Sequence, residues 1–234
     1  MSKNKAPKKK VSCIVAAAGK GSRMQADMNK IFLEYAGIPV LAHTLSTLES
    51  CPLIDEIIIV TSECDIMGCQ DIVREFGIAK VKTITIGGAQ RQDSVRNALA
   101  ELSQDTDIVL IHDAARSLVT HDVIENVVTD VIAYGAAAPG VPCKSTLKEA
   151  DTDGIICATP DRSRMYEIQT PQGFAYDLIC RAHENALQNK LSGTDDCYLV
   201  EQLGHRVKIS EGDYRNIKIT TPEDLLIAEC LTSR

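Results

Sequence analysis

The chain has 234 residues, of which 44% are hydrophobic and 4% aromatic, and its formal net charge at pH 7 is -7. This length suits one large α/β domain, while the acidic balance and the absence of Trp argue against a general nucleic-acid or membrane surface. Nine cysteines with no C-x-x-C pair indicate a reduced, cytoplasmic protein without a zinc site.

The basic start of the chain, MSKNKAPKKK, is expected to be a disordered tail over residues 1–10, and residues 11–234 are expected to form a single domain. We reject a signal peptide, because cleavage after the small residues 16–18 would remove the first core strand. No run approaches the ~20 apolar residues that a membrane span requires. We therefore expect neither a membrane nor a nucleic-acid partner.

The segment Val11–Phe32 changes abruptly from an apolar run to Gly, Lys, Ser and Arg, which predicts a buried parallel strand followed by a phosphate-binding loop. A Walker A loop does not fit, since Gly21 separates Lys20 from Ser22, and a dinucleotide fingerprint does not fit, since Met24 replaces the third glycine. The pattern A-A-G-x-G-x-R-M followed by a lysine and an aromatic residue does fit, at Ala17, Ala18, Gly19, Gly21, Arg23, Met24, Lys30 and Phe32. It resembles nucleotidyltransferases that join a sugar or polyol phosphate to a nucleoside triphosphate, and an ordinary glycine turn is the alternative for this segment alone.

Strand and helix patterns alternate through the next part of the chain. After a short extended piece at 38–40, we expect helices at 41–50, 66–76, 90–102 and 120–134 and strands at 56–61, 81–86 and 108–112. Such alternation implies right-handed crossovers. The predicted fold class is α/β, a Rossmann-like, doubly wound, mostly parallel sheet.

The alternation ends after Val141. Mixed polarity around the turn at 151–154 predicts a hairpin, a β-arm projecting from the domain at about residues 143–163. Because a projecting hairpin needs a surface to lie on, we expect a homodimer formed through this arm, with a self-packed flap as the alternative. The remaining pattern predicts helices at 176–189 and 195–203, strands at 207–211 and 216–219, and a last helix from Thr221.

Polar side chains gather where ligands of open α/β sheets bind, beyond the carboxyl ends of the strands. Four further motifs carry them: G-G-A-Q-R-Q-D-S-V with Arg91 and Ser94, H-D-A-A-R with Asp113 and Arg116, D-R-S-R-M-Y-E-I-Q-T-P with Arg162 and Thr170, and N-I-K-I-T-T-P-E-D with Lys218. With the glycine loop, these motifs resemble the 2-C-methyl-D-erythritol 4-phosphate cytidylyltransferase family in order, over residues 11–231. The alternatives are a turn cap for Asp113, surface ion pairs for Arg116 and Arg162, and a solvated Lys218.

The resemblance implies a reaction in which a phosphate monoester attacks the α-phosphorus of CTP in line and expels pyrophosphate, giving 4-diphosphocytidyl-2-C-methyl-D-erythritol. It implies that Arg23, Lys30 and Lys218 are catalytic, that Asp113 binds Mg²⁺, and that no general base is needed. His112 is interpreted as structural. The substrate-binding residues that the resemblance implies are Ala17, Ala18, Gly19, Gly21, Gly88, Arg91, Ser94, Ala114, Arg116, Thr146, Arg162 and Thr170, with Thr146 and Arg162 supplied by the arm of the other subunit.

Three positions depart from the family pattern. Ala89 stands where several relatives have an acidic residue, which leaves cytosine selection to main-chain groups, and Arg215 replaces an acidic residue that Asp213 could substitute for. Ser117 replaces a proline, which costs a rigid turn but no chemical group.

Ribitol 5-phosphate cytidylyltransferase is the nearest alternative function, although the Ala17–Gly19 motif favours methylerythritol. A nucleotide-binding oxidoreductase and a binding module without turnover are the more distant alternatives, and 234 residues leave no room for a fused cyclase domain.

Overall fold

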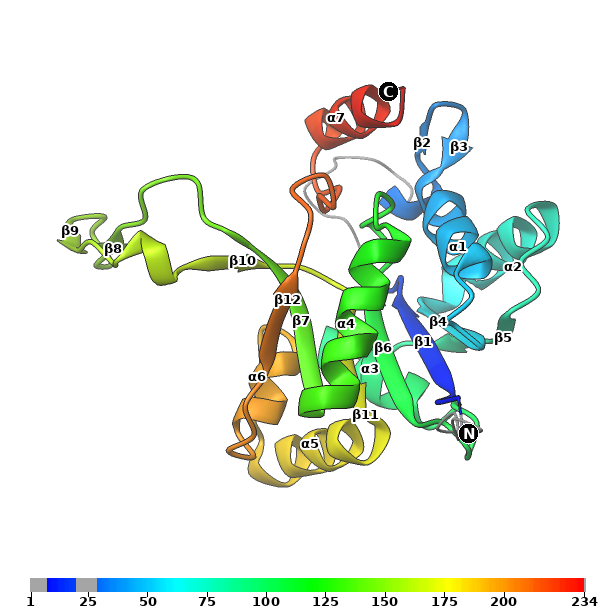
Figure 1. Ribbon diagram of the computed structural model, residues 1–234. Helices are drawn as coiled ribbons and strands as arrows, with labels where there is room; N and C mark the ends of the chain where they lie inside the picture. The colour runs from blue at the N-terminus through cyan, green and yellow to red at the C-terminus, as the bar shows by residue number, and fades with distance from the viewer. Residues whose placement is uncertain (1–7, 20–28, 234) are drawn as a thin grey trace, which may run out of the picture.

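The computed structural model describes residues 8–19 and 29–233 (Figure 1). Its main sheet has the strand order β10-β7-β11-β6-β1-β4-β5, and β12 pairs with β7. The strands are β1 (Val11–Ala16), β4 (Glu56–Thr61), β5 (Val81–Ile86), β6 (Ile108–Asp113), β7 (Ala136–Pro142), β10 (Tyr166–Ile168), β11 (Gln172–Ala175) and β12 (Lys208–Glu211). The pairs among β6, β1, β4 and β5 are parallel, whereas β11 and β10 run antiparallel to their neighbours.

Helices cover both faces of this sheet, because neighbouring residues of each strand point to opposite sides. On β1, Cys13 and Val15 belong to one hydrophobic core and Ile14 belongs to the other. The first core is closed by α1 (Val40–Ser50), α2 (Ile66–Glu75) and α4 (His121–Tyr134), and the second by α3 (Arg91–Leu99), α5 (Tyr176–Asn189) and α6 (Asp196–Glu201). The predicted doubly wound, mostly parallel α/β fold is confirmed.

Strands β7 and β11 of the main sheet have no counterpart among the predicted elements. In β7 the residues are AAAPGVP, which lack β-branched bulk, and β11 is only four residues long. Small residues suit these places because neighbours approach closely: a Cβ on Gly173 would lie 2.6 Å from a Val127 methyl, and one on Gly140 would lie 3.0 Å from an Ile209 methyl. Packing against α4 and β12, rather than strand propensity, therefore places β7 and β11.

The predicted strand at 216–219 is wrong, because this segment is irregular in the structure. Its polar groups bond to loops at the edge of the sheet instead of to a strand. Asn216 donates from Nδ2 to the Thr170 carbonyl at 2.9 Å, and the Ile219 N–H donates to the Ala115 carbonyl at 2.8 Å. The segment thus lies across the carboxyl ends of the strands and leads into α7 (Pro222–Thr232).

The hairpin predicted after Val141 projects from the body of the domain (Figure 1). It contains β8 (Glu149–Ala150) and β9 (Ile156–Ala158), which pair antiparallel, followed by η4 (Arg162–Arg164) and β10. All residues from 144 to 159 are exposed. The arm therefore makes no apolar core of its own within the chain.

The basic start of the chain contacts the domain at its last three residues. Lys8 pairs with Asp55, Lys9 with Asp107 at 2.7 Å, and the Lys10 N–H donates to Asp107 at 2.9 Å. These contacts place residues 8–10 beside the loops that precede β4 and β6, whereas the predicted disordered tail extended through residue 10. Residues 1–7 lie outside the described part of the chain.

Within residues 8–19 and 29–233, no helix is long and apolar enough to cross a lipid bilayer.

Candidate active site

A cavity of about 470 Å³ lies at the carboxyl ends of the parallel strands. The loop after β1, the loop after β5 and the end of β6 form its walls, and the irregular segment before α7 brings Lys218 to it. This is the edge at which open α/β sheets bind ligands, because the loops that leave neighbouring parallel strands diverge there.

Asp113, the last residue of β6, is the charged centre of the cavity. Its Oδ2 lies 2.6 Å from Lys218 Nζ and its Oδ1 lies 3.5 Å from Arg91 Nε. Lys218 and Arg91 thus contact different oxygens of this carboxylate. Burial raises the pKa of Asp113, but Lys218 and Arg91 outweigh burial and lower it to about 2. The carboxylate is therefore ionised at neutral pH.

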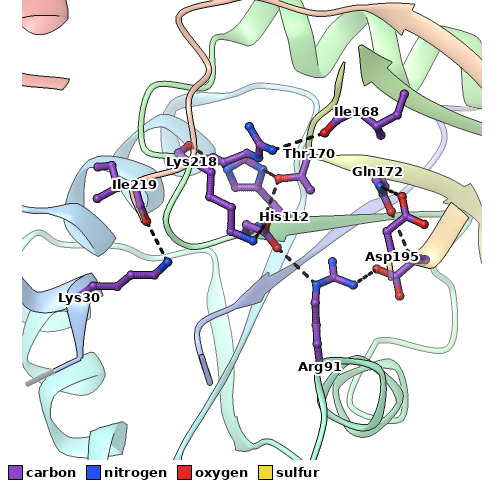
Figure 2. A network of polar contacts seen from close by, with 12 residues as sticks. Lys30, Arg91, His112, Ile168, Thr170, Gln172, Asp195, Lys218 and Ile219 are labelled. Atoms are coloured by element: carbon purple, nitrogen blue, oxygen red, sulfur yellow. Dashed lines mark hydrogen bonds and ion pairs between the residues drawn. The ribbon is translucent and has the colours of Figure 1, made fainter. Parts of the chain in front are cut away.

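A buried chain of hydrogen bonds fixes the backbone of Asp113. Its N–H donates to Thr170 Oγ1 at 3.0 Å, and the same hydroxyl oxygen lies 3.0 Å from His112 Nδ1 (Figure 2). Because the Arg116 carbonyl can only accept, His112 Nε2 donates to it at 3.2 Å, and Nδ1 of the neutral ring then accepts from the Thr170 hydroxyl. Burial lowers the pKa of His112 to about 4. The interpretation of His112 as a structural residue agrees with this neutral, Nε2-protonated ring.

The buried His112 predicts a pH dependence of stability. Because its pKa is lower in the folded than in the unfolded chain, the unfolded chain binds the proton first and stability falls as the pH drops from about 6.5 to about 4. We expect this residue to lower the free energy of unfolding by on the order of 2 kcal/mol between pH 7 and pH 5. Urea unfolding at both pH values measures the loss, which should shrink in His112→Gln and persist in the exposed-site control His121→Gln. An equal loss in His112→Gln would contradict the assignment.

Lys30 enters the cavity from the other end of the glycine loop. It begins η2 (Lys30–Phe32), and its Nζ donates to the Ile219 carbonyl at 2.8 Å (Figure 2). Asn29 caps this turn and also donates to the Ala17 carbonyl at 3.2 Å. Lys30 and Lys218 are 188 positions apart in the sequence but lie in one cavity.

The loop after β5 presents backbone to the cavity at a pair of glycines. A Cβ on Gly87 would lie 2.6 Å from Ser94 Oγ, and one on Gly88 would lie 2.3 Å from the Cβ of Asp93, so neither position accepts a side chain without movement. Ser94 Oγ accepts from the Gly88 N–H at 3.0 Å and donates to the Gln90 carbonyl at 3.0 Å. This loop therefore offers a closely packed main-chain surface for a flat ligand.

The structure brings most of the expected residues together. The cavity lining includes Ala17, Ala18, Gly19, Lys30, Gly88, Arg91, Ser94, Asp113 and Lys218, together with Ala89. Gly21 and Arg23 lie outside the described residues.

The other expected residues lie elsewhere. Thr170 sits behind Asp113, and Ala114 is fully buried. Arg116 donates to the Asn216 carbonyl at 2.7 Å rather than lining the cavity. Thr146 and Arg162 belong to the exposed arm, where Arg162 donates to the Lys144 carbonyl at 2.7 Å. Within one chain, the arm residues are therefore not part of the cavity.

Arg215, which replaces an acidic residue of the family pattern, and Asp213, its possible substitute, both lie outside the cavity lining. Arg215 donates from Nη2 to the Leu231 carbonyl at 2.7 Å, so its charge is directed toward α7. Asp213 accepts from the Arg215 N–H at 2.8 Å. The proposed replacement of an acidic residue by Asp213 assumed an extended segment, and the segment is not extended.

Asp196 is a charged residue that the sequence interpretation missed, as is Glu63, which lines the cavity. Asp196 is only 1% exposed, and its Oδ2 lies 2.7 Å from Arg91 Nη1. The sequence signal was the acidic pair at residues 195–196, which was interpreted only as the start of a helix. Asp195 does cap α6 by accepting from the Tyr198 N–H at 3.0 Å, while Asp196 faces Arg91.

Asp113 is the residue that could hold a metal ion. Within residues 8–19 and 29–233, no group of three or more His, Cys, Asp or Glu side chains forms a ready-made metal site. An ionised carboxylate at the wall of a cavity that is also lined by cations suits Mg²⁺, which keeps several waters and takes its other ligands from substrate phosphates. The donor set therefore fits Mg²⁺ carried by a nucleotide.

Comparison with known proteins decides between the interpretations of this cavity. The family model described as IspD, 2-C-methyl-D-erythritol 4-phosphate cytidylyltransferase, matches residues 11–234. The chain belongs to this family. The resemblance seen in the motifs is confirmed, and the chain is a nucleotidyltransferase. The ribitol 5-phosphate and oxidoreductase alternatives are not favoured.

Relatives of the family cover almost the whole chain. The 2-C-methyl-D-erythritol 4-phosphate cytidylyltransferase of Caldanaerobacter subterraneus subsp. tengcongensis is 46% identical over 220 residues, 94% of this chain and 97% of that protein. The protein of that name from Pelotomaculum thermopropionicum is 46% identical over 223 residues, 95% of this chain and 94% of its own length. The crystal structure of 4-diphosphocytidyl-2C-methyl-D-erythritol synthase from Anaerococcus prevotii DSM 20548 has a TM-score of 0.86 at 32% identity and covers 97% of both chains.

Proposed function

We propose that this member of the IspD family uses the cavity around Asp113 to join CTP and 2-C-methyl-D-erythritol 4-phosphate, giving 4-diphosphocytidyl-2-C-methyl-D-erythritol and pyrophosphate. The observation that carries the proposal is the convergence of Lys30, Arg91 and Lys218 on one cavity that also holds the Asp113 carboxylate. Three cations offset the charge of a triphosphate and an attacking phosphate monoester, which would otherwise repel each other.

Each of these side chains has its own proposed role in the transfer. Lys218 and Lys30 both line the cavity, and we assign them to the reacting phosphates, Lys218 from the side of Asp113 and Lys30 from the side of the glycine loop. Arg23 is proposed as a further cation for the α-phosphate, although it lies outside the described residues. Mg²⁺, held by Asp113, would supply charge neutralisation to the phosphate oxygens. Because the attacking phosphate is already an anion, no side chain has to remove a proton.

Cytosine recognition is assigned to the main chain of two loops. The backbone of Ala17, Ala18 and Gly88 lines the cavity, and Ser94 holds the Gly88 N–H in place. Carbonyl oxygens can accept from the exocyclic amine of cytosine, a group that uracil lacks. Ala89 brings no side-chain acceptor, so selection for CTP is proposed to rest on these backbone groups.

Pyrophosphate release tests the proposed function. Purified protein is incubated with Mg²⁺, CTP and 2-C-methyl-D-erythritol 4-phosphate, and matched reactions replace the acceptor with ribitol 5-phosphate or CTP with UTP. We expect release with the first set and little with the others. Tight CTP binding without pyrophosphate release would instead support a binding module that has lost turnover.

The exposed arm supports a proposed homodimer. Ile155 and Ile156 near the arm tip are 65% and 60% exposed, and Thr146 and Arg162 lie on the arm outside the chain's own cavity. Two copies that exchange arms would bury these apolar side chains and bring Arg162 to the partner's acceptor phosphate.

All nine cysteines are free thiols, which supports the proposal that the enzyme works in the reducing cytoplasm.

Subunit mixing tests whether the arm acts on the partner's cavity. Arg162→Ala and Lys218→Ala proteins, each expected to be nearly inactive alone, are mixed under conditions of subunit exchange. We expect activity to recover to about one quarter of the wild-type value, because half of randomly paired dimers are mixed and each mixed dimer holds one intact site. No recovery, despite mixed dimers detected by mass spectrometry, would contradict the arrangement.

Ile155→Glu should weaken the proposed dimer and so lower the molecular mass measured by light scattering. The control Leu226→Glu, at a 65% exposed site on α7, should leave that mass unchanged.

A further inference from the structure

Arg91 is shared between two carboxylates at the wall of the cavity. Its Nη1 lies 2.7 Å from Asp196 Oδ2, and its Nε lies 3.5 Å from Asp113 Oδ1. Charge-assisted hydrogen bonds between such groups are usually about 2.7–2.9 Å long. The contact with Asp196 is therefore tight, and the contact with Asp113 is loose.

Asp196 has little freedom to follow Arg91. Its backbone N–H donates to Gln172 Oε1 at 3.1 Å, and Gln172 Nε2 in turn donates to Asp195 Oδ2 at 2.8 Å (Figure 2). His183 Nε2, on α5 and 2% exposed, lies 3.3 Å from Asp196 Oδ1. Strand β11, helix α5 and the start of helix α6 thus hold a buried carboxylate behind the arginine.

The arrangement has a consequence for Asp113. An arginine without Asp196 could turn its planar fork onto Asp113 and contact both carboxylate oxygens, since bidentate pairing is the preferred geometry of these groups. Lys218 already occupies Oδ2 at 2.6 Å. Because Asp196 holds Arg91 away, the Asp113 Oδ1 atom makes no ion pair shorter than 3.5 Å with the residues that the structure describes.

We propose that Asp196 is a positioning residue, which holds Arg91 at the cavity wall so that Asp113 keeps an oxygen for the cation that accompanies CTP. This inference rests on the proposed function. Burying a charged carboxylate is costly unless it is paired. The positioning of Arg91 gives a reason for burying Asp196, which is not part of the cavity lining. Asp196 acts on the nucleotide site only through Arg91.

The test measures CTP binding by calorimetry, without acceptor and therefore without turnover, in Mg²⁺ and in EDTA. For Asp196→Asn, we expect the strengthening of CTP binding by Mg²⁺ to fall roughly 10- to 100-fold, as is typical when a residue behind a metal ligand is removed. CTP binding in EDTA should stay within about twofold of wild type, because the three cations of the cavity remain. The control Asp130→Asn removes a carboxylate that accepts from Ser210 Oγ at 2.7 Å outside the cavity lining, and it should change neither value.

Two further variants keep the test decisive. Arg91→Lys keeps the charge but lacks the fork that could close on both oxygens of Asp113, so the double variant Arg91→Lys/Asp196→Asn should keep the Mg²⁺ dependence that Asp196→Asn alone loses. Asp196→Glu keeps the carboxylate and should retain part of the strengthening of CTP binding by Mg²⁺. Equal weakening in Mg²⁺ and EDTA, or no change in either, would overturn the inference. Pyrophosphate release by the wild-type protein is assayed in parallel, so that failure of the proposed function is seen separately.

Discussion

Replacing Lys218 with methionine is expected to lower kcat by roughly 10²- to 10³-fold, the loss usually seen when one preorganised donor to a charged transition state is removed. Methionine keeps much of the side-chain volume but removes the ammonium group that lies 2.6 Å from Asp113. The pKa of Asp113 should rise as well, since Lys218 is the strongest of the charges that lower it. Steady-state pyrophosphate release with saturating CTP and acceptor measures the change.

The matched control is Lys208→Met, which removes an ammonium group that lies over the Tyr134 ring, away from the cavity lining. It should leave kcat within about twofold of wild type, as surface substitutions usually do. If Lys218→Met retained wild-type kcat while both variants remained folded, Lys218 would be a solvated residue, and its place in the reaction would be refuted.

Replacing Asp113 with asparagine is expected to lower kcat/KM by roughly 10³-fold, because the variant removes the carboxylate proposed to hold Mg²⁺ and leaves Lys218 and Arg91 without their shared anion. The Mg²⁺ concentration that gives half-maximal activity should rise in the same variant. Wild-type activity should show no acid limb from Asp113 above pH 4, since its pKa is about 2. Initial rates across Mg²⁺ concentration and pH measure both effects.

Asp130→Asn serves again as the control, because it removes a hydrogen-bonded carboxylate on α4 rather than at the cavity. Circular dichroism and thermal unfolding verify that Asp113→Asn is folded. A folded Asp113→Asn protein with an unchanged Mg²⁺ requirement would show that Asp113 is a turn residue, the alternative for this position.

The sequence predicted the cavity because parallel strands place their following loops at one edge. Asp113 ends β6 and Arg91 begins the helix that follows β5, so the alternation of strands and helices was enough to bring them together. Lys218 was found by motif rather than by strand pattern, and its segment is irregular. Its position depends on Asn216 and Ile219, whose hydrogen bonds to other loops no local periodicity encodes.

Asp196 shows why part of the site could not be predicted. An acidic residue in the first turn of a helix is a common feature that favours the helix dipole, and nothing in the local sequence separates such a residue from a buried ion-pair partner. Its role appears only when α6 packs beside β11 and α5. The arm is similar: its hairpin was predictable, but Ile155 is 65% exposed in the structure, and the surface proposed to cover it is encoded by no local pattern.

A crystal structure with CTP and Mn²⁺ tests the central claim most directly, because the anomalous signal of Mn²⁺ locates the cation independently of the nucleotide. The account predicts one Mn²⁺ bound to Asp113 and to phosphate oxygens of CTP, with Lys30 and Lys218 on the same triphosphate. A nucleotide bound elsewhere, or a cation that Asp113 does not contact, would contradict it.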